Sequence, residues 1–309
     1  MRTDLPTVSV IINCYNSERY LQEALESVLT QSFSDWELIF WDNRSTDESA
    51  QIFNRFRDTR FRYFLAPEHT ILGRAKLLAI KEARGVWLAF LDCDDLWVKD
   101  KLEQQVSIAL LEGQDVGLIY GGMSMRIELE ALDTPLGRSA LAVNPNRRMH
   151  SLPEGNVFAE LLNEDFIPQP SAMVRRSAYE AVGGIDDSLR HAWDYDLFVK
   201  IARGYKVRAV QSVICTYRVH ASNLSHSQAE HSYREAIEIV HRYLPAIEAR
   251  QGLRSHQTHF AAYQIWQGSL WQGTMRLLFK GNISLFAWKV VRLGFRFIRG
   301  VRSPERVNS

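Results

Sequence analysis

Three aspartates within four residues, Asp92, Asp94 and Asp95, follow directly on an apolar run over residues 86–91. An unbroken apolar run of this length is typical of a strand that is buried on both faces. Carboxylates this close together raise one another's pKa and oppose folding, and a divalent cation would cancel that cost. Carboxylate oxygens are the ligands that Mg²⁺ and Mn²⁺ prefer. Ligands of open parallel sheets bind beyond the carboxyl ends of the strands. We therefore expect a metal, and with it a phosphate-bearing ligand, at this strand end.

The same acidic cluster has two other interpretations. Acidic residues after a strand are often a solvated turn that only caps the next helix. An Asp-x-Asp pair after a buried strand is also how phosphatases of the haloacid dehalogenase type begin, with the first aspartate, here Asp92, as the nucleophile. The residues upstream and downstream must decide between these alternatives.

Two other expected strands end in polar and aromatic side chains that could hold a nucleobase. Asn13 and Tyr15 follow the apolar run 8–12, and Asp42 and Asn43 follow the run 36–41. An aromatic ring can stack on a base while Asp and Asn side chains read its edge. Ordinary caps and turns would explain either motif taken alone. The chain has no GxxxxGK[ST] P-loop and no GxGxxG after its first strand, which argues against those two nucleotide-binding modes.

Two further motifs lie about 100 residues or more after the acidic cluster. Asp194 and Asp196 precede an apolar helix, where one of them could simply stabilise the helix start. A functional interpretation requires one of them to act as a base that faces the metal site. His220 ends a β-rich segment together with Arg218; a lone histidine is more often a hydrogen-bonded surface residue than a ligand.

Charge is unevenly distributed along the 309 residues. Residues 276–309 carry eight Lys/Arg and one Glu, a net charge of +7, whereas the preceding residues carry 29 Lys/Arg and 35 Asp/Glu, a net charge of −6. A basic end of this kind points to an anionic partner. Three widely spaced cysteines form no CxxC pair and favour a reducing compartment. We expect neither a signal peptide nor a membrane-spanning segment.

Strand and helix patterns alternate over the first two thirds of the chain. This alternation predicts an α/β fold with a mostly parallel sheet flanked by helices. Residues 122–152 are predicted to be an irregular surface excursion, and two short strands are expected near 207–209 and 213–217. After residue 229 the pattern is helical throughout. We predict a catalytic domain over residues 1–228 and a helical C-terminal region over residues 229–309.

Taken together, the motifs match a known pattern in order and spacing. Over residues 5–225 the chain resembles the family 2 glycosyltransferases, which have the GT-A fold and a Rossmann-like sheet. The matching segments are Val8–Asn16, Asp42–Asp47, Leu91–Asp95, Gly183–Asp186, Trp193–Leu197 and Tyr217–His220.

The resemblance implies a role for each matching residue. Asn13, Tyr15, Asp42 and Asn43 would line the nucleobase pocket, and Asp92 would face the ribose. Lys76 stands where the family has the arginine of an Ala-Arg-Asn motif and would contact the donor. The residues that would bind Mg²⁺ or Mn²⁺ are Asp94 and His220, and Arg218 would approach the diphosphate or the metal beside His220. Asp194 would be the catalytic base. The family's stereochemistry is inversion at the anomeric carbon.

The function implied is transfer of a sugar from a nucleotide sugar, a UDP-sugar being the expected donor, to a glycan or lipid-linked acceptor in cell-surface polysaccharide synthesis. The alternative is a catalytically silent nucleotide-sugar or glycan-binding module. Residues 285–299 place basic residues on one stripe of an apolar helix. This pattern suits either peripheral contact with the cytoplasmic membrane face or packing on the protein's own domain. We expect a cytoplasmic protein without a nucleic-acid partner.

Overall fold

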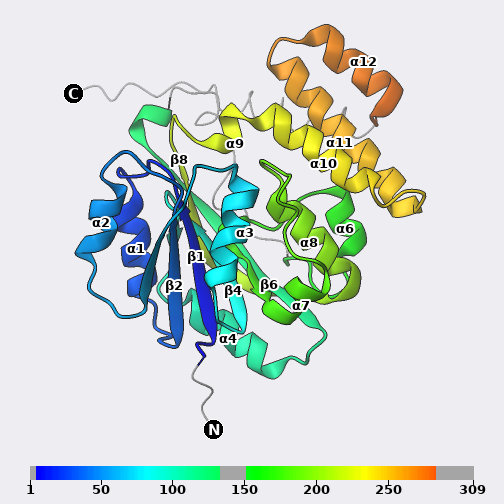
Figure 1. Ribbon diagram of the computed structural model, residues 1–309. Coiled ribbons are helices and arrows are strands. Elements are labelled where there is room, and N and C mark those ends of the chain that lie inside the picture. Colours follow the sequence, from blue (N-terminus) through cyan, green and yellow to red (C-terminus); the bar gives the residue numbers. More distant parts are fainter. Residues whose placement is uncertain (1–4, 133–150, 283–309) are drawn as a thin grey trace, which may run out of the picture.

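The computed structural model describes residues 5–132 and 151–282. At its centre lies an eight-stranded sheet with the strand order β3-β2-β1-β4-β7-β6-β8-β5 (Figure 1). The strands are β1 (Val8–Cys14), β2 (Trp36–Asp42), β3 (Phe61–Leu65), β4 (Trp87–Asp92), β5 (Leu96–Trp97), β6 (Val116–Ile127), β7 (Met173–Arg175) and β8 (Lys206–Val219).

Helices cover both faces of this sheet. The α-helices are α1 (Leu21–Leu29), α2 (Ser49–Arg55), α3 (Leu72–Glu82), α4 (Lys101–Leu111), α6 (Phe158–Asn163), α7 (Arg176–Ala181), α8 (Trp193–Gly204), α9 (Leu224–Ser227), α10 (Ala229–His241), α11 (Ile247–Trp266) and α12 (Leu270–Lys280). Two 3₁₀ turns, η1 (Leu129–Ala131) and η2 (Gln169–Ser171), complete the described elements.

Two hydrophobic cores form because successive side chains of a strand point to opposite faces. In β1, Val8, Val10 and Ile12 pack with α1, α2 and α4, whereas Ile11 packs with α3, α6 and α8 on the other face. The apolar stripe of α1 that the sequence predicts is buried as expected. The predicted α/β architecture, with helices on both faces of a mostly parallel sheet, is confirmed.

Strand direction brings the functional side chains to one edge. Pairs β1–β2, β2–β3, β1–β4 and β6–β8 are parallel, and only β7 and β5 pair antiparallel to their neighbours. Since β7 runs opposite to both β4 and β6, the strands β1 to β4, β6 and β8 all point the same way. Their carboxyl ends therefore lie along one edge, at the top in Figure 1.

The last long strands differ from the sequence prediction. β6 continues through residues 122–127, where we expected an excursion, and β8 is one strand where we expected two. The pairing of Gly121 with Val210 is followed by that of Gly122 with Val213, so residues 211 and 212 form a bulge. A bulge interrupts the alternating pattern without ending the strand, which is why the sequence suggested a break. Residues 133–150 of the expected excursion lie outside the described residues.

The C-terminal helices pack on the face that carries α6 and α8. α11 lies against α6 so closely that a Cβ at Gly252 would collide with the carbonyl of Leu162. Ile239 and Val240 of α10 join the core of that face, while α12 packs on α11 (Figure 1). The described C-terminal region is helical, as expected, but a domain boundary at residue 228 stays a prediction. Among the described helices, none has the length and hydropathy of a membrane-crossing segment.

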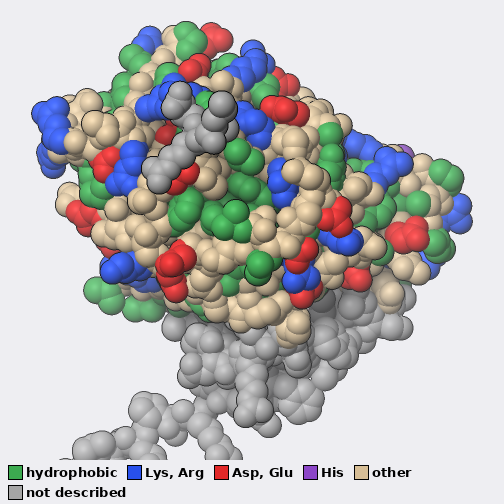
Figure 2. Space-filling model, turned by 90° about the horizontal axis from the view of Figure 1, so that it is seen from below, with side chains coloured by type: hydrophobic (Ala, Val, Ile, Leu, Met, Phe, Trp, Pro, Cys, Tyr) green, Lys and Arg blue, Asp and Glu red, His purple; other side chains and the backbone are tan. Residues whose placement is uncertain are grey.

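The face seen from below in Figure 1 lies opposite the carboxyl ends of the strands. In Figure 2, hydrophobic, basic and acidic side chains are interspersed over this face, without a large area of one charge.

Candidate active site

Strand register places the predicted residues of β1, β2 and β4 side by side. Asn13 lies opposite Trp41 on one side and Asp92 on the other, and Cys14 lies opposite Asp42. Three motifs that are separated by up to 80 residues in sequence thus meet at the ends of adjacent strands. All three cysteines are free and buried.

The two predicted metal ligands are in contact. Nε2 of His220 lies 2.9 Å from Oδ2 of Asp94, although 126 residues separate them. His220 is held from behind by Ser222 Oγ, 2.9 Å from its Nδ1, and by Asn223, whose Oδ1 accepts a hydrogen bond from the His220 amide at 2.6 Å. Its ring also packs on Tyr20 at a centroid distance of 4.8 Å. Both side chains face one point from different strands.

The third aspartate of the cluster has a structural position. Asp95 is buried, and its Oδ1 accepts a hydrogen bond of 2.9 Å from the backbone amide of Arg218. Burial, with the negative charges of Asp94 and Asp92, raises the pKa of Asp95 well above its usual range. A proton on Asp95 removes one of the three like charges, which explains how the cluster is tolerated.

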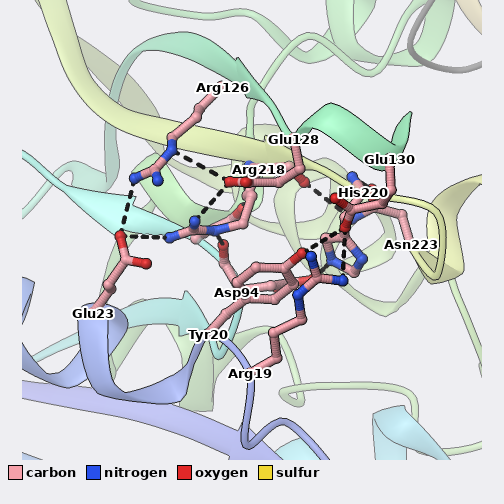
Figure 3. A network of polar contacts seen from close by, with 11 residues as sticks. Arg19, Tyr20, Glu23, Asp94, Arg126, Glu128, Glu130, Arg218, His220 and Asn223 are labelled. Atoms are coloured by element: carbon pink, nitrogen blue, oxygen red, sulfur yellow. Dashed lines mark hydrogen bonds and ion pairs between the residues drawn. The ribbon is translucent and has the colours of Figure 1, made fainter. Parts of the chain in front are cut away.

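Arg218, which the resemblance places with His220 near the diphosphate or metal, is held by two glutamates and the acidic turn. Figure 3 shows its guanidinium enclosed by Glu23 and Glu128, with N–O distances of 3.1 and 2.8 Å. Its Nε donates to the carbonyl of Asp94 at 2.9 Å, and the ring of Tyr20 lies 4.5 Å away. Burial works to lower the pKa of Arg218, but the contacts with the two glutamates raise it. Arg218 therefore ties β8 to the acidic turn.

Lys76 links the acidic strand to the helix that carries the predicted base. Its buried ammonium group lies 2.9 Å from Oδ1 of Asp92 and 5.4 Å from the ring centroid of Trp193. Trp193 is buried and packs edge-on against Phe90 of β4 at 5.4 Å. The tryptophan thus supports the N-terminus of α8, and Lys76 balances the charge of Asp92. Arg74, the neighbouring cation, pairs with Asp187 instead.

Asp194 follows Trp193 in the first turn of α8. Burial raises the pKa of Asp194 to about 6; a hydrogen bond from the amide of Tyr195 opposes the shift, and the charge of Asp92 adds to it. A carboxylate with a pKa near neutrality is suited to accept a proton. Asp196, two residues on, is occupied by ion pairs with Lys200 and Arg242 at 2.5 and 3.0 Å.

A second carboxyl group lies within electrostatic range of Asp194. Asp165 lies between α6 and η2 and is exposed. Desolvation of its carboxyl group and the negative charge of Asp194 raise the pKa of Asp165 above its usual range. Sequence reasoning missed Asp165, because no spacing rule relates it to residue 194.

The predicted nucleobase residues fall into two groups. Tyr15 is half exposed, and its ring lies 4.2 Å from that of His69. Asp42 is buried and accepts hydrogen bonds from the Ser45 amide at 2.7 Å and the Tyr63 hydroxyl at 2.6 Å. The roles of these residues in binding a base stay predictions.

Asn43 and Asn13 complete the four predicted nucleobase residues. The side chain of Asn43 clamps the backbone of Thr70, donating to its carbonyl and accepting from its amide. Oδ1 of Asn13 is buried and lacks a hydrogen-bond partner among the described residues. Of the four, Tyr15 and Asn13 therefore have groups free to meet a ligand.

The side chains of Asp94 and His220 fit a cation whose other ligands are water and substrate phosphates. Within residues 5–132 and 151–282, no group of three or more His, Cys, Asp or Glu side chains is arranged to hold a metal by itself. Mg²⁺ usually keeps several waters and binds through one or two carboxylates together with substrate phosphates. One carboxylate and one imidazole in contact match that mode and do not match a closed cage.

Comparison with known proteins agrees with this geometry. A family model described as glycosyl transferase family 2 matches residues 9–183, more than half of the chain, and one described as glycosyltransferase-like family 2 matches residues 146–250. An uncharacterized glycosyltransferase of Rickettsia prowazekii is 28% identical over 72% of this chain and 67% of its own length. The Escherichia coli UDP-Glc:alpha-D-GlcNAc-diphosphoundecaprenol beta-1,3-glucosyltransferase WfaP is 27% identical over 74% of this chain and 84% of its own.

Solved structures share the fold. S. aureus TarS 1-349 in complex with UDP superposes with a TM-score of 0.62, at 20% identity over 84% of this chain and 73% of the other. The mannosyltransferase PcManGT of Pyrobaculum calidifontis, in complex with GDP-Man and Mn²⁺, gives 0.58, at 18% identity over 92% of this chain and 84% of the other. Several curated relatives are matched over less than two thirds of their own length. The chain belongs to glycosyltransferase family 2 and has the GT-A fold.

Proposed function

We propose that this protein is a metal-dependent, inverting glycosyltransferase that moves a sugar from a nucleoside diphosphate sugar to a hydroxyl of a glycan or lipid-linked acceptor. The observation that carries the proposal is the meeting, at one sheet edge, of Asp94 with His220 and of Asp92 with Lys76, next to Asp194. A carboxylate with a raised pKa beside this cluster favours a catalytic site over a silent binding module.

The residues divide the reaction among them. Asp194 takes the proton of the acceptor hydroxyl as its oxygen attacks the anomeric carbon, and the bond from that carbon to the diphosphate oxygen breaks. A single base and direct displacement give inversion. A Mg²⁺ or Mn²⁺ held by Asp94 and His220 would supply positive charge to the leaving diphosphate. Lys76 holds Asp92 in place, and Tyr15 offers a ring face to the nucleobase.

UDP-sugars are the proposed donors, and cell-surface polysaccharide is the proposed product. Support comes from the printed activities of two relatives, WfaP and WfgD, both named as transferring glucose from UDP-Glc to a diphosphoundecaprenol-linked sugar; WfgD is 34% identical over 37% of this chain and 44% of its own length. A lipid-linked acceptor would place the protein in the cytoplasm, at the inner face of the membrane.

The test is a thermal-shift screen of UDP, GDP and dTDP sugars, with and without MnCl₂. We expect one nucleotide class to raise the melting temperature in a Mn²⁺-dependent way, and Asp94→Ala to abolish that rise. Asp115→Asn is the matched control, because this exposed carboxylate pairs with Lys206 at the opposite end of β6. Binding without turnover would favour the silent module, and the absence of any shift in folded protein would contradict the proposal.

Peripheral membrane contact is a second part of the proposal. α12 exposes Trp271 and Phe279, at 74% and 79% of their surface, next to Lys280. Exposed aromatic side chains with neighbouring cations are typical of helices that lie in a membrane interface. The basic helix predicted for residues 285–299 lies outside the described residues.

Co-sedimentation with vesicles tests this contact. We expect binding to vesicles that contain phosphatidylglycerol and not to pure phosphatidylcholine, and we expect the double variant Trp271→Ser, Phe279→Ser to bind several-fold less. Leu110→Ser with Leu111→Ser is the control, because this pair on α4 is equally exposed and apolar but lies far from α12. Equal losses in both variants would contradict a specific surface.

A further inference from the structure

Gln169 is a buried glutamine whose side chain has nothing to bind. Its exposed fraction is 8%, and both Nε2 and Oε1 lack a hydrogen-bond partner among the described residues. Buried polar side chains in native proteins almost always find partners, because each one left unmade costs free energy. A buried carboxamide whose nitrogen and oxygen both lack hydrogen-bond partners therefore requires an explanation.

The backbone around Gln169 is fixed from three sides. Trp97 donates from its Nε1 to the carbonyl of Pro170 at 2.8 Å, and Gln105 donates to that of Ser171 at 2.8 Å. The Ser171 hydroxyl donates to Pro168 at 2.7 Å. The unsatisfied side chain therefore sits on a rigid 3₁₀ turn and not on a flexible loop, so it is held where it is for a reason other than local disorder.

Sheet register shows where this turn lies. Met173 of β7 pairs with Ala89 of β4, and the Phe90 amide donates to the carbonyl of Ala172. Because β7 runs antiparallel to β4, the residues before Ala172 pass the carboxyl end of β4, where Asp92 and Asp94 lie. η2 accordingly packs against β4, β5 and β8. Gln169 is therefore next to the acidic turn.

This inference rests on the proposed function, in which different parts of the site bind different parts of the nucleotide sugar. The nucleobase residues lie on β1 and β2, and the diphosphate residues lie at Asp94 and His220. Gln169 lies on the opposite side of β4 from β1, four residues after Asp165, which is within electrostatic range of Asp194. The group between the diphosphate and the proposed catalytic base, Asp194, is the sugar to be transferred.

We propose that Gln169 is a specificity-determining residue whose carboxamide binds hydroxyl groups of the donor sugar. An amide presents a donor and an acceptor side by side, and neighbouring hydroxyls of a sugar ring can satisfy both. A site built to hydrogen-bond a substrate hydroxyl rejects analogues that lack it, because its own polar groups are then left unpaired. Gln169 reads the hydroxyl pattern of the sugar in this way.

Gln169→Met separates binding from stability. Methionine has a similar length and volume but no hydrogen-bonding amide, so it leaves no cavity and removes the unsatisfied group. In the ligand-free protein we expect the melting temperature to rise by about 2–4 °C. With Mn²⁺ present, isothermal titration should show a dissociation constant about tenfold higher for the bound nucleotide sugar, which corresponds to one or two lost hydrogen bonds, and unchanged within about twofold for its nucleoside diphosphate.

The probes are UDP-glucose, UDP-N-acetylglucosamine and GDP-mannose, each compared with UDP or GDP. Gln31→Met is the matched control, because this buried glutamine donates to the carbonyls of Ser27 and Val98 and accepts from the Leu102 amide, three hydrogen bonds that lie outside η2. We expect Gln31→Met to lower the melting temperature without a selective loss of sugar binding. The opposite signs of the two thermal shifts distinguish an unsatisfied amide from a structural one.

Two results would overturn the inference while leaving the proposed function intact. One is that Gln169→Met weakens the nucleoside diphosphate as much as its sugar conjugate. The other is that only the Michaelis constant of the acceptor rises. If the wild-type protein binds no nucleotide at all, the proposed function fails, and this inference fails with it.

Discussion

The two sides of the candidate site satisfy their polar groups differently. On the metal side, formed by Asp94, Asp95, Arg218 and His220, each of these residues is bound to another of the set or to a neighbouring glutamate or serine (Figure 3). On the sugar side, formed by Asp165, Gln169 and Asp194, both carboxyl groups have raised pKa values and an amide has no partner in the described structure.

The difference agrees with how much the ligand of each side varies between enzymes. A cation with a diphosphate is the same group whatever sugar is carried, so a rigid and fully paired platform serves it well. Sugar and acceptor change from one enzyme to another, and unsatisfied groups keep their binding capacity for them. Polar groups without partners destabilise the fold, so they persist only where the surrounding structure holds them in place. The metal side and the backbone of η2 provide that support.

The largest expected effect is on the sugar side, at Asp194. Asp194→Asn removes the proton acceptor, so we expect turnover to fall by about 10²–10⁴-fold while nucleotide binding persists. The folded pKa of about 6 lies above the ordinary 3.8, so the wild-type protein loses stability as pH rises from about 4 to about 6. The asparagine variant lacks this loss and should melt at a higher temperature at pH 7–8. Initial rates and thermal melts measure both.

The pH profile of the wild-type enzyme also tests whether Asp194 is the base. The base must be deprotonated, so kcat/KM should fall as pH drops below about 6. Asp196→Asn is the control from the same helix turn, because it breaks ion pairs with Lys200 and Arg242 and should lower stability while leaving the pH profile in place. An Asp194→Asn variant with wild-type turnover would show that the base lies elsewhere.

The next largest effect is expected on the metal side, at Arg218. Arg218→Met leaves Glu23 and Glu128 without their buried cation and removes the link to the carbonyl of Asp94. Removing one partner of a buried ion pair costs about 3–5 kcal/mol. We expect a loss of unfolding free energy in that range, together with weaker Mn²⁺-dependent nucleotide binding, because His220 follows Arg218 by two residues. Urea unfolding and titration measure the two effects.

Arg126 offers a matched control for this variant. It contacts the same two glutamates, but 49% of its side chain is exposed, against 1% for Arg218. Exposed ion pairs contribute about 0–1 kcal/mol, so Arg126→Met should be nearly neutral. Equal costs for the two variants would mean that the metal side is held by surface charge and not by the buried arginine.

Much of the metal side could be predicted from sequence, because its chemistry lies in short motifs. Asp92, Asp94 and His220 stand at strand ends, and parallel strands bring their carboxyl ends to one edge. Sequence shows that Arg218 is charged, but it does not show that Glu23 of α1 and Glu128 after β6 enclose it. Glu23 and Glu128 carry no motif that would have revealed them.

The sugar side was harder to predict. Asp194 was found through its place before an apolar helix, but Asp165 and Gln169 lie in a turn whose position depends on how β7 pairs with β4. The β-bulge at residues 211–212 likewise divided β8 into two apparent strands, because a local break in alternation looks the same as a turn. Such features follow from long-range pairing, which a local pattern does not encode.

A buried cation on α4 belongs to neither side of the site. Lys101 is fully buried, 4.0 Å from the ring centroid of Trp97 in β5, and hydrogen-bonds to Gln105 at 2.6 Å. In the described part of the chain, no carboxylate lies within ion-pair distance of it. Burial lowers its pKa to about 7 from the usual 10.5. Lys101 is thus a buried charge without compensation, in contrast to its neighbours.

Lys101→Met tests whether that buried charge destabilises the protein. Between about pH 7 and 10.5 the unfolded chain keeps a proton on this lysine that the folded protein gives up, so wild-type stability falls as pH drops from 10 toward 7. As pH drops over this interval, the melting temperature of Lys101→Met should therefore rise relative to that of the wild type. Lys200→Met is the control; it leaves the buried Asp196 with one partner fewer and should be destabilising throughout. A wild-type-to-variant difference that stays constant from pH 6.5 to 9.5 would mean that Lys101 titrates alike in both states. Burial on α4 would then cost the charged form of this lysine no free energy, which would contradict the gain expected for Lys101→Met.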